Sequence, residues 1–448
     1  FFTFGVVLGM EHSWQTALGA VFISGIIFVI LSVSPVRAWL VNAIPQNLKL
    51  GIAAGIGLFL GFIALKNAGI VVAHEATFIT LGNIASFEAI LFITGFVVIV
   101  ALSARRIMGA VIIGILLITL IAALFGKIDF DGIVAAAPAY NWTAFTAGFV
   151  QIQQAMFPDG DLDRPVLTPE SLSLLATSIL TACDADDGVV DGVMTDPRRC
   201  DFSPAELPRC VGDKPAADCV TEAQLTAIEA VYKGPVSGEE PFFFGFNYGG
   251  ENDEGGWDSW VVESTRQWPL DIPNAQYGFG TEFYKYFVFG DPNWDYKDYD
   301  FSTWQEDTAD ISRVVDATET DLREFRNRGG KIIYWTGWSD LALTPLGTID
   351  YYEQLEAGDP TVRDYAKLYM LPGVLHCAGG PGPDKVDWVE AIQAWVEEGR
   401  APERLLASKR DSAGGVTLTR PVCPYPQEAV YDGVGDPSRQ ASFRCDRP

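Results

Sequence analysis

Hydrophobic positions divide this chain into two parts of different character. Up to about residue 126, four long apolar runs follow one another, at roughly 16–34, 50–65, 87–104 and 107–126. Each run is about long enough to cross the ~30 Å hydrocarbon core of a bilayer as a helix, although the second is marginal. Because charge is nearly absent from every face of these runs, the pattern favours about four transmembrane helices over a buried helical bundle.

Beyond residue 129 the apolar runs are short, and three of them have the pattern of buried parallel strands. They lie in DFDGIVAAAPAYNW, in GGKIIYWTGWSD and in YAKLYMLPGVLHC, and helical patterns follow the last two at about 346–356 and 385–398. Strands that alternate with helices predict a parallel α/β sheet, in which functional groups gather at the carboxyl ends of the strands.

Asp340 and His376 stand at the ends of the last two predicted strands. An acid followed by a base in this position has the order of the Ser…Asp…His triad of α/β-hydrolases. There the aspartate orients the imidazole, and the imidazole takes the proton of the nucleophile. Taken singly, Asp340 could be a turn residue and His376 a loop histidine. Together, in a chain with only three histidines, they favour a catalytic acid and base.

The nucleophile of such a triad is missing from these 448 residues, because they contain no Gly-x-Ser-x-Gly sequence. The serine would be expected on a strand-to-helix turn upstream of DFDGIVAAAPA. This chain has the apolar run AVIIGILLITLIAALFGK at that place. Ser86 and Ser103 lie in apolar runs without the glycines that a strained turn requires. The pattern therefore predicts an incomplete α/β-hydrolase core.

Charge separates the same two parts. Residues 1–126 contain no Asp and carry a net charge of about +2, whereas the whole chain carries −26. The acidic second part argues against nucleic acid as a partner, because phosphate neutralisation needs Lys and Arg. Basic residues fall in the loops after the first and third runs, namely Arg37, Lys49, Arg105 and Arg106. The positive-inside rule makes both loops cytoplasmic and predicts a membrane protein whose second part is extracellular or periplasmic.

All seven cysteines lie after residue 182, which indicates disulfides and an oxidising compartment, with buried free thiols as the alternative. An odd number leaves one cysteine unpaired, and the other six could pair in 15 ways.

An acidic loop lies in CDADDGVVDGVMTDP, where Asp184, Asp187 and Asp191 fall within eight residues. Oxygen-rich loops of this kind suit Ca²⁺. The loop is not an EF-hand, because its twelfth position is Thr195 rather than Glu. On composition alone, a solvated acidic turn is the alternative.

Several longer phrases resemble the tannase/feruloyl esterase family. They include DFDGIVAAAPAYNWT, FYKYFVFGDPNWDYKDYDF, GWSDLALTPLGTIDYYE, LYMLPGVLHCAGGPGPD and RPVCPYPQEAVYDGVGDPSRQASFRC. The resemblance covers about residues 129–448 and implies a carboxylic ester hydrolase for aromatic acid esters, such as galloyl or feruloyl esters. It also implies a lid at approximately 165–320, with Asp340 and His376 as triad acid and base. The family's N-terminal portion, with its nucleophile turn, is missing here.

The same resemblance implies how the cysteines and the acidic loop are used. Cys377 is expected to be unpaired, because its partner would lie in the missing portion. A structural Ca²⁺ in the lid is expected on Asp184, Asp187, Asp191 and the carbonyls of Val189 and Val193. The other cysteines are expected to pair as Cys183–Cys200, Cys210–Cys219 and Cys423–Cys445.

Residues 1–126 resemble an internal fragment of a nucleobase permease of the xanthine/uracil type, in its guanine/hypoxanthine/adenine branch. The phrases are SWQTALGAVFISGIIF, SPVRAWLVNAIPQNLKLGIAAGIGLFLGFIALKNAGIVV and RRIMGAVIIGILLITL. Three hypotheses follow: an extracellular esterase tethered to the membrane, a membrane transporter with a hydrolase appendage, or a non-functional chimera joined near residues 126–131. We expect little or no esterase activity, since loss of a triad nucleophile costs about 10⁶ in kcat.

Overall fold

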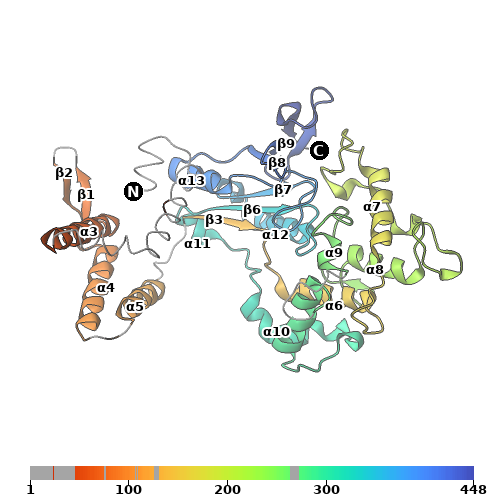
Figure 1. Cartoon of the computed structure of the whole chain (residues 1–448), viewed down its shortest axis with the longest axis horizontal. Coiled ribbons are helices and arrows are strands. Elements are labelled where there is room, and N and C mark those ends of the chain that lie inside the picture. The colour runs from red at the N-terminus through yellow and green to blue at the C-terminus, as the bar shows by residue number, and fades with distance from the viewer. Residues whose placement is uncertain are drawn as a thin grey trace. The chain divides into compact units, whose positions relative to one another are not determined.

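The structure is a computed structural model that describes residues 24, 46–74, 77–105, 107, 109–125, 131–262 and 272–447. The chain divides into two compact units, Phe1–Asp129 and Phe130–Pro448, and each is described by itself (Figure 1). The predicted apolar run at 16–34 lies outside the described residues apart from Ser24.

The described part of the first unit contains three helices and a hairpin. The elements are α3 (Gln46–Asn67), β1 (Val71–His74), β2 (Phe78–Leu81), α4 (Phe87–Ala104) and α5 (Ala110–Leu124). Strands β1 and β2 are antiparallel. This hairpin was not predicted from the sequence, because its two strands have only four residues each.

Glycines let α4 and α5 approach each other closely. A Cβ atom at Gly95 would lie 2.8 Å from the side chain of Ile118, and one at Gly114 would lie 2.2 Å from that of Ile99. This is the contact that small residues permit between apolar helices.

The prediction of membrane-spanning helices is not confirmed by the helices themselves. No helix among the described residues is long and apolar enough to cross a membrane. Helix α5 has 15 residues, which cover about 22 Å of the ~30 Å required. Helix α3 has 22 residues, but polar residues at both ends shorten its apolar stretch. Helix α5 is thus shorter than its predicted run of 107–126, whereas α4 coincides with its run and α3 extends beyond its run.

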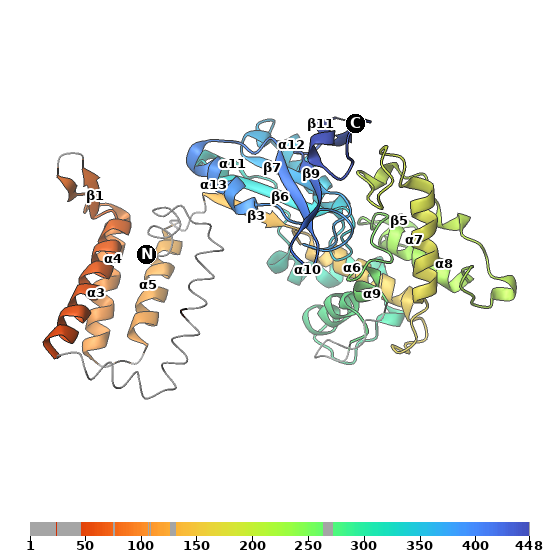
Figure 2. The same ribbon diagram turned by 45° about the horizontal axis from the view of Figure 1, so that its top comes forward.

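The second unit is built around a three-stranded parallel sheet, which confirms the predicted α/β class. Its strands are β3 (Gly132–Ala136), β6 (Lys331–Gly337) and β7 (Ala366–Leu371), in the order β3-β6-β7. Both pairings are parallel, with Ile133 opposite Ile332 and Tyr334 opposite Leu368. The two views show the three strands side by side, with helices on both faces (Figure 2).

Two helices cover the faces of this sheet. Ile332, Tyr334 and Leu368 pack in a cluster that includes residues of α12 (Pro345–Gly358). On the opposite face, Trp335 and Tyr369 pack in a cluster that includes residues of α13 (Trp388–Glu398). Alternate strand residues therefore serve opposite faces, as the period of a strand requires. Both faces are covered, which explains the nearly continuous apolar sequence of β6 and β7.

A large, mostly helical region connects β3 to β6 and contains the predicted lid. Its hydrophobic core is rich in aromatic side chains, among them the fully buried Trp257, Tyr284 and Phe149. Its α-helices are α6 (Trp142–Met156), α7 (Pro169–Cys183), α8 (Glu222–Lys233), α9 (Trp257–Trp260), α10 (Trp304–Val315) and α11 (Arg323–Asn327), joined by short helices and the hairpin β4 (Val236–Ser237) and β5 (Glu240–Pro241).

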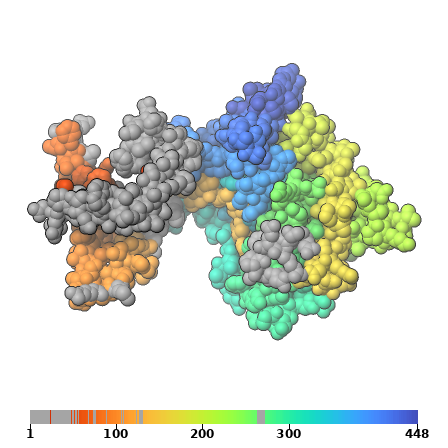
Figure 3. Space-filling model, viewed as in Figure 1, coloured from red at the N-terminus to blue at the C-terminus, as the bar shows by residue number. Residues whose placement is uncertain are grey.

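The C-terminal residues form two hairpins next to the sheet and the lid. They comprise β8 (Leu405–Arg410) with β9 (Val416–Val422), and β10 (Glu428–Tyr431) with β11 (Phe443–Asp446). The space-filling view shows these dark blue residues projecting beside the yellow surface that includes α7 (Figure 3).

The three disulfides expected from the resemblance are present in the structure. Their pairs are Cys183–Cys200, Cys210–Cys219 and Cys423–Cys445. Cys377 is free and exposed, also as expected.

Candidate active site

The loops that follow β6 and β7 approach each other because Gly337 has no side chain. A Cβ atom at Gly337 would lie 2.0 Å from the carbonyl oxygen of Val374. The contact continues through the Trp338 N–H, which donates to the Leu371 carbonyl at 2.9 Å, and the Ser339 N–H, which donates to the Val374 carbonyl at 3.1 Å. These backbone contacts place the two predicted site residues at one end of the sheet.

Asp340 is held by the turn that it begins. Its side chain is fully buried. Oδ1 accepts the N–H groups of Ala342 at 2.8 Å and Leu343 at 2.9 Å, and Oδ2 lies 3.0 Å from Nδ1 of His376. A carboxylate only accepts hydrogen bonds, so Nδ1–H of His376 is the donor. Asp340 therefore holds its own turn and also pairs with His376. We call Asp340 and His376 the acid–base pair.

The pair stabilises the charged form of the imidazole. Burial lowers the pKa of His376, but the hydrogen bond to Asp340 and the contact with the Cys377 thiol outweigh burial and raise the pKa to about 10. About a third of the His376 side chain remains exposed. The ring is therefore anchored on its Nδ1 side and can be reached by other groups.

Cys377 follows the base with a strained backbone. Its φ is 62°, a left-handed value that residues other than glycine rarely adopt. The turn around it is closed by the Ala378 N–H, which donates to the His376 carbonyl at 2.8 Å. Asp384 then fixes the loop by accepting the Gly379 N–H at 3.1 Å. This loop directs the His376 ring toward Asp340.

Aromatic rings next to His376 were not assigned from the sequence. Trp260 contacts the His376 ring edge to face, with 5.4 Å between ring centroids. It also stacks on Phe279 at 6.0 Å, and Phe279 contacts Trp142 at 6.3 Å. We call Trp142, Trp260 and Phe279 the aromatic shelf. The sequence alone does not tell which aromatic rings of this region reach the histidine.

No hydroxyl nucleophile is positioned at this pair by the described residues of the second unit. Within them, no serine or threonine hydroxyl forms a hydrogen bond with His376. Ser339 precedes Asp340 but lines a separate cavity.

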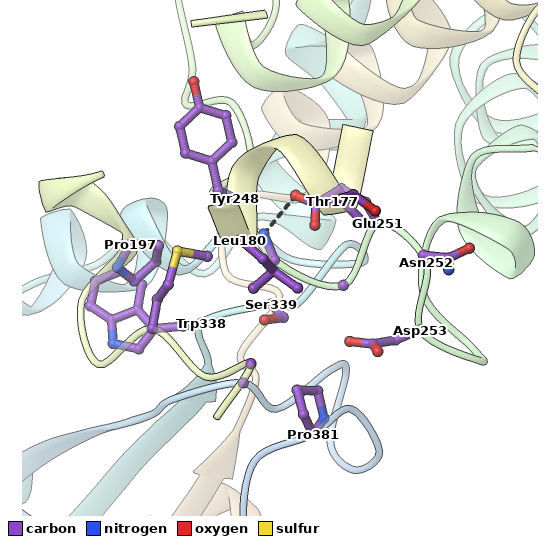
Figure 4. Close-up of a pocket in the computed structure, with 16 residues that line it drawn as sticks. Thr177, Leu180, Pro197, Tyr248, Glu251, Asn252, Asp253, Trp338, Ser339 and Pro381 are labelled. Carbon is purple, nitrogen blue, oxygen red and sulfur yellow. Dashed lines mark hydrogen bonds between the residues drawn. The ribbon is translucent and has the colours of Figure 1, made fainter. Parts of the chain in front are cut away.

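That cavity, of about 240 Å³, lies between the lid and the loops after β6 and β7. In Figure 4, Ser339 and Trp338 lie opposite Glu251, Asn252 and Asp253. Neither Asp340 nor His376 lines it. Burial raises the pKa of Glu251, although its carboxylate accepts hydrogen bonds from the Gly249 N–H and the Tyr232 hydroxyl. This cavity is thus separate from the acid–base pair.

The acidic loop, residues 184–195, is folded around its own carboxylates. Asp184 accepts the Gly192 N–H at 2.8 Å, and Asp187 accepts the N–H and the hydroxyl of Thr195 at 3.0 and 2.7 Å. Asp191 accepts the Val193 N–H at 3.2 Å, and its other oxygen lies 2.6 Å from a guanidinium nitrogen of Arg420.

The charges of the acidic loop are incompletely balanced. Burial raises the pKa of Asp191, Arg420 opposes this effect, and the negative charges of Asp187 and Asp184 add to it. In the described part of the chain, no group of three or more His, Cys, Asp or Glu side chains is arranged to hold a metal ion. Calcium binding by this loop therefore stays a prediction.

Comparison with known proteins identifies the second unit. The family described as tannase and feruloyl esterase matches residues 120–446, which is more than half of the chain. The chain belongs to this family. Membership agrees with the resemblance in the sequence and with the positions of Asp340 and His376 at the ends of neighbouring strands.

Relatives within the tannase and feruloyl esterase family include bacterial and fungal hydrolases. The mono(2-hydroxyethyl) terephthalate hydrolase of Piscinibacter sakaiensis is 34% identical over 370 residues, covering 71% of this chain and 60% of the relative. Feruloyl esterase C of Talaromyces stipitatus is 28% identical over 342 residues, covering 71% and 61%. The chain thus spans about 60% of the length of these relatives.

A solved structure of this family has the same fold. The crystal structure of feruloyl esterase B from Aspergillus oryzae aligns with a TM-score of 0.61 at 22% identity, covering 71% of this chain and 64% of that one.

The N-terminal segment of this tannase-family chain matches a different group. The permease family matches residues 1–182. Adenine permease AdeP of Escherichia coli is 41% identical over 139 residues, which are 31% of each chain. The permease resemblance in the sequence is therefore confirmed, and the two family matches overlap at residues 120–182.

Proposed function

We propose that the second unit supplies the acid–base half of a carboxylic ester hydrolase that acts on aromatic acid esters. The observation that supports this most directly is the 3.0 Å contact between Asp340 and His376, with the aspartate buried and fully hydrogen-bonded. In ester hydrolysis a histidine held in this way takes the proton of the attacking hydroxyl and returns it to the leaving alkoxide. Asp340 keeps the ring oriented and stabilises its charged form.

The pKa of His376 sets the direction of the pH dependence. Because the pKa is raised to about 10, the ring is mostly protonated at pH 7 and cannot accept a proton. The neutral ring, which acts as the base, becomes more abundant as the pH rises toward 10. The rate of hydrolysis is therefore expected to increase between pH 7 and pH 10.

An aromatic acyl group fits the aromatic shelf. Trp260 lies against the His376 ring, and Phe279 has 42% of its surface exposed. Stacking on such rings favours a flat aromatic acid over an aliphatic one. The names of the relatives, a terephthalate ester hydrolase and feruloyl esterases, agree with this substrate class.

Hydrolysis of methyl ferulate tests this function. The purified chain is expected to hydrolyse it slowly, about 10⁶-fold below a complete triad, because the described residues offer no positioned serine. His376→Ala should reduce the rate to the buffer level, whereas His74→Ala in the first unit should leave it unchanged. A rate above the buffer level that is equal in the wild type and His376→Ala would contradict the proposal.

Membrane attachment through residues 1–126 is the second element of the proposal. The permease match supports it, and so do large apolar side chains that are more than half exposed on the three described helices, such as Leu58, Phe96 and Leu116. The three disulfides support a location of the hydrolase unit outside the cytoplasm. Transport of nucleobases is less well supported, because the match to the adenine permease covers only 31% of that protein.

Calcium binding by the acidic loop is the third element. Asp184, Asp187, Asp191 and the carbonyls of Val189 and Val193 would hold the ion with oxygen ligands, as Ca²⁺ prefers. Support comes from the three carboxylates within one loop and from the unbalanced negative charge around Asp191. A bound Ca²⁺ would connect the end of α7 to the loop that follows.

A further inference from the structure

Three amide side chains of the lid are fully buried close to the acid–base pair. They belong to Gln153, Asn274 and Gln276. Gln153 lies in α6, whereas Asn274 and Gln276 directly precede the helical turn Tyr277–Thr281, which contains Phe279 of the aromatic shelf. Amide side chains are mostly exposed in proteins, because burial requires protein partners in place of water. The hydrogen bonds of these three residues therefore show what the lid holds in place.

Asn274 fixes its segment to two other parts of the lid. Its Nδ2 donates to Oε1 of Gln153 at 2.9 Å and to the carbonyl of Val261 at 2.7 Å. Its Oδ1 accepts the Tyr277 N–H at 2.8 Å. Val261 directly follows Trp260 of the aromatic shelf. The segment 274–277 is thus attached to α6 on one side and to the end of α9 on the other.

Gln276 extends from this segment to the turn of Asp340. Its Nε2 donates to the carbonyl of Leu341 at 3.0 Å. That carbonyl and the N–H of Ala342 are the two ends of one peptide group, and the N–H donates to Oδ1 of Asp340 at 2.8 Å. Because a peptide group is planar and turns as one piece, a hydrogen bond at its oxygen also fixes the direction of its N–H. Gln276 therefore directs an N–H group that holds the Asp340 carboxylate.

We propose that Gln276 is a positioning residue for ester hydrolysis, through which the lid holds the acid–base pair in its working geometry. This rests on the proposed esterase function. The hydrogen bonds run from Gln276 through a single peptide group to Asp340, and from there to His376. Hydrogen bonds in such a chain polarise one another, so each strengthens the next. The docked lid thereby keeps the carboxylate turned toward the imidazole.

A purely structural role for Gln276 is the alternative, because any buried carbonyl needs a donor. Gln154, also in the lid, offers a matched comparison, since its Nε2 donates to the carbonyl of Tyr296 at 2.8 Å. Oε1 of Gln276 is buried and has no hydrogen-bond partner within the described residues, so only the donor end of this amide is used. Methionine has a side chain of similar length and no donor. Gln276→Met therefore removes one hydrogen bond from the turn of Asp340, and Gln154→Met removes a similar bond elsewhere in the lid.

The first test follows the pKa of His376 by NMR in the full chain, purified in a mild detergent with labelled histidines. The signal is assigned from its loss in His376→Ala. In Gln276→Met the pKa should fall by about one unit or more, because the carboxylate is no longer kept in place beside the ring. In Gln154→Met it should stay at the wild-type value. Both variants leave the Cys377 thiol, the other group that raises this pKa, in place.

Hydrogen exchange at the Ala342 amide measures the connection itself. In Gln276→Met this exchange should become about three- to tenfold faster, which corresponds to the loss of one hydrogen bond, and in Gln154→Met it should not change. Circular dichroism checks that both variants are folded. A measurement on the wild type depends on neither variant. In urea below the unfolding transition, the amides of Tyr277 and Ala342 should lose protection together, because the proposed connection makes them one cooperative unit.

The outcomes separate this inference from the proposed function. An unchanged or higher pKa of His376 in Gln276→Met overturns the inference, and so does an equal fall in Gln154→Met. Wild-type protein in which Tyr277 loses protection while Ala342 keeps it also overturns it. None of these measurements uses a substrate. A chain that shows the expected fall in pKa but no His376-dependent hydrolysis of methyl ferulate therefore supports the connection between lid and pair, and contradicts the esterase function instead.

Discussion

The acid–base pair and the acidic loop share a local turn around an aspartate but differ in their chemistry. In both, an aspartate accepts a backbone N–H two residues further on, from Ala342 to Asp340 and from Val193 to Asp191. The second oxygen of Asp340 meets His376, whereas that of Asp191 meets Arg420. Local turn chemistry places each carboxylate. The partner of each carboxylate comes from elsewhere in the fold and determines what the carboxylate can do. His376 can gain or lose a proton, whereas Arg420 is permanently charged.

Removing Arg420 should have the largest effect on stability. The guanidinium is almost buried, contacts Asp191 at 2.6 Å and lies 4.0 Å from the centroid of the Phe443 ring. Arg420→Ala leaves a partly buried carboxylate without its counter-charge, which should lower the free energy of unfolding by about 2–4 kcal/mol. Urea denaturation measures this change.

An exposed ion pair provides the control. Arg313 and Asp310 are both mostly exposed, so Arg313→Ala should cost less than about 0.5 kcal/mol. Equal losses in the two variants would show that Arg420 does not support the acidic loop.

Removal of calcium should have the next largest effect, if the acidic loop binds it as proposed. With free Ca²⁺ about 100-fold above its dissociation constant, binding stabilises the folded state by about 2.7 kcal/mol. A chelator should therefore lower the midpoint of thermal unfolding. Asp191→Asn should abolish the response, while Asp340→Asn should retain it. Thermal unfolding that is the same with Ca²⁺ and with chelator would contradict calcium binding.

A methyl group at Gly337 should damage the acid–base pair without touching it. Because the added Cβ would meet the Val374 carbonyl at 2.0 Å, the loops after β6 and β7 must separate. Gly337→Ala is expected to cost about 1–3 kcal/mol. Gly358→Ala, at the end of α12, has nothing within 4 Å of the new atom and should be nearly neutral. Stability of Gly337→Ala equal to that of Gly358→Ala would show that the two loops are not held by this contact.

The sequence predicted the parts of these sites that depend on local pattern. Asp340 and His376 end apolar runs that proved to be neighbouring strands, so their proximity followed from parallel pairing. The disulfides followed from family resemblance. The partner of Asp191 could not be predicted, because Arg420 is 229 residues away and belongs to a strand with no catalytic pattern. Trp260 was missed for the same reason, since its contact with His376 depends on how the lid packs.

Hydropathy was less informative in the first unit. It identified the positions of α3, α4 and α5, but the run at 107–126 is longer than α5, and the run at 50–65 is shorter than α3. Helix boundaries depend on turns and on polar residues at the ends, which a sum of hydropathy over a window does not resolve. Gly95 and Gly114 carry the contact between α4 and α5, and only the packed helices reveal them.

Asp340→Asn should have the smallest effect on stability at pH 10 and above, and the clearest effect on the pair. The amide keeps an oxygen for the backbone N–H groups of the turn, but it lacks the charge that raises the pKa of His376. The imidazole pKa, followed by NMR in a chain with three histidines, should fall from about 10 toward its ordinary value. A raised folded-state pKa stabilises the protein fully below the unfolded value of about 6.5. This stabilisation disappears as the pH rises through 10. The wild type should therefore lose stability relative to Asp340→Asn between pH 6.5 and 10, and a constant difference over that range would show that Asp340 does not stabilise the charged His376.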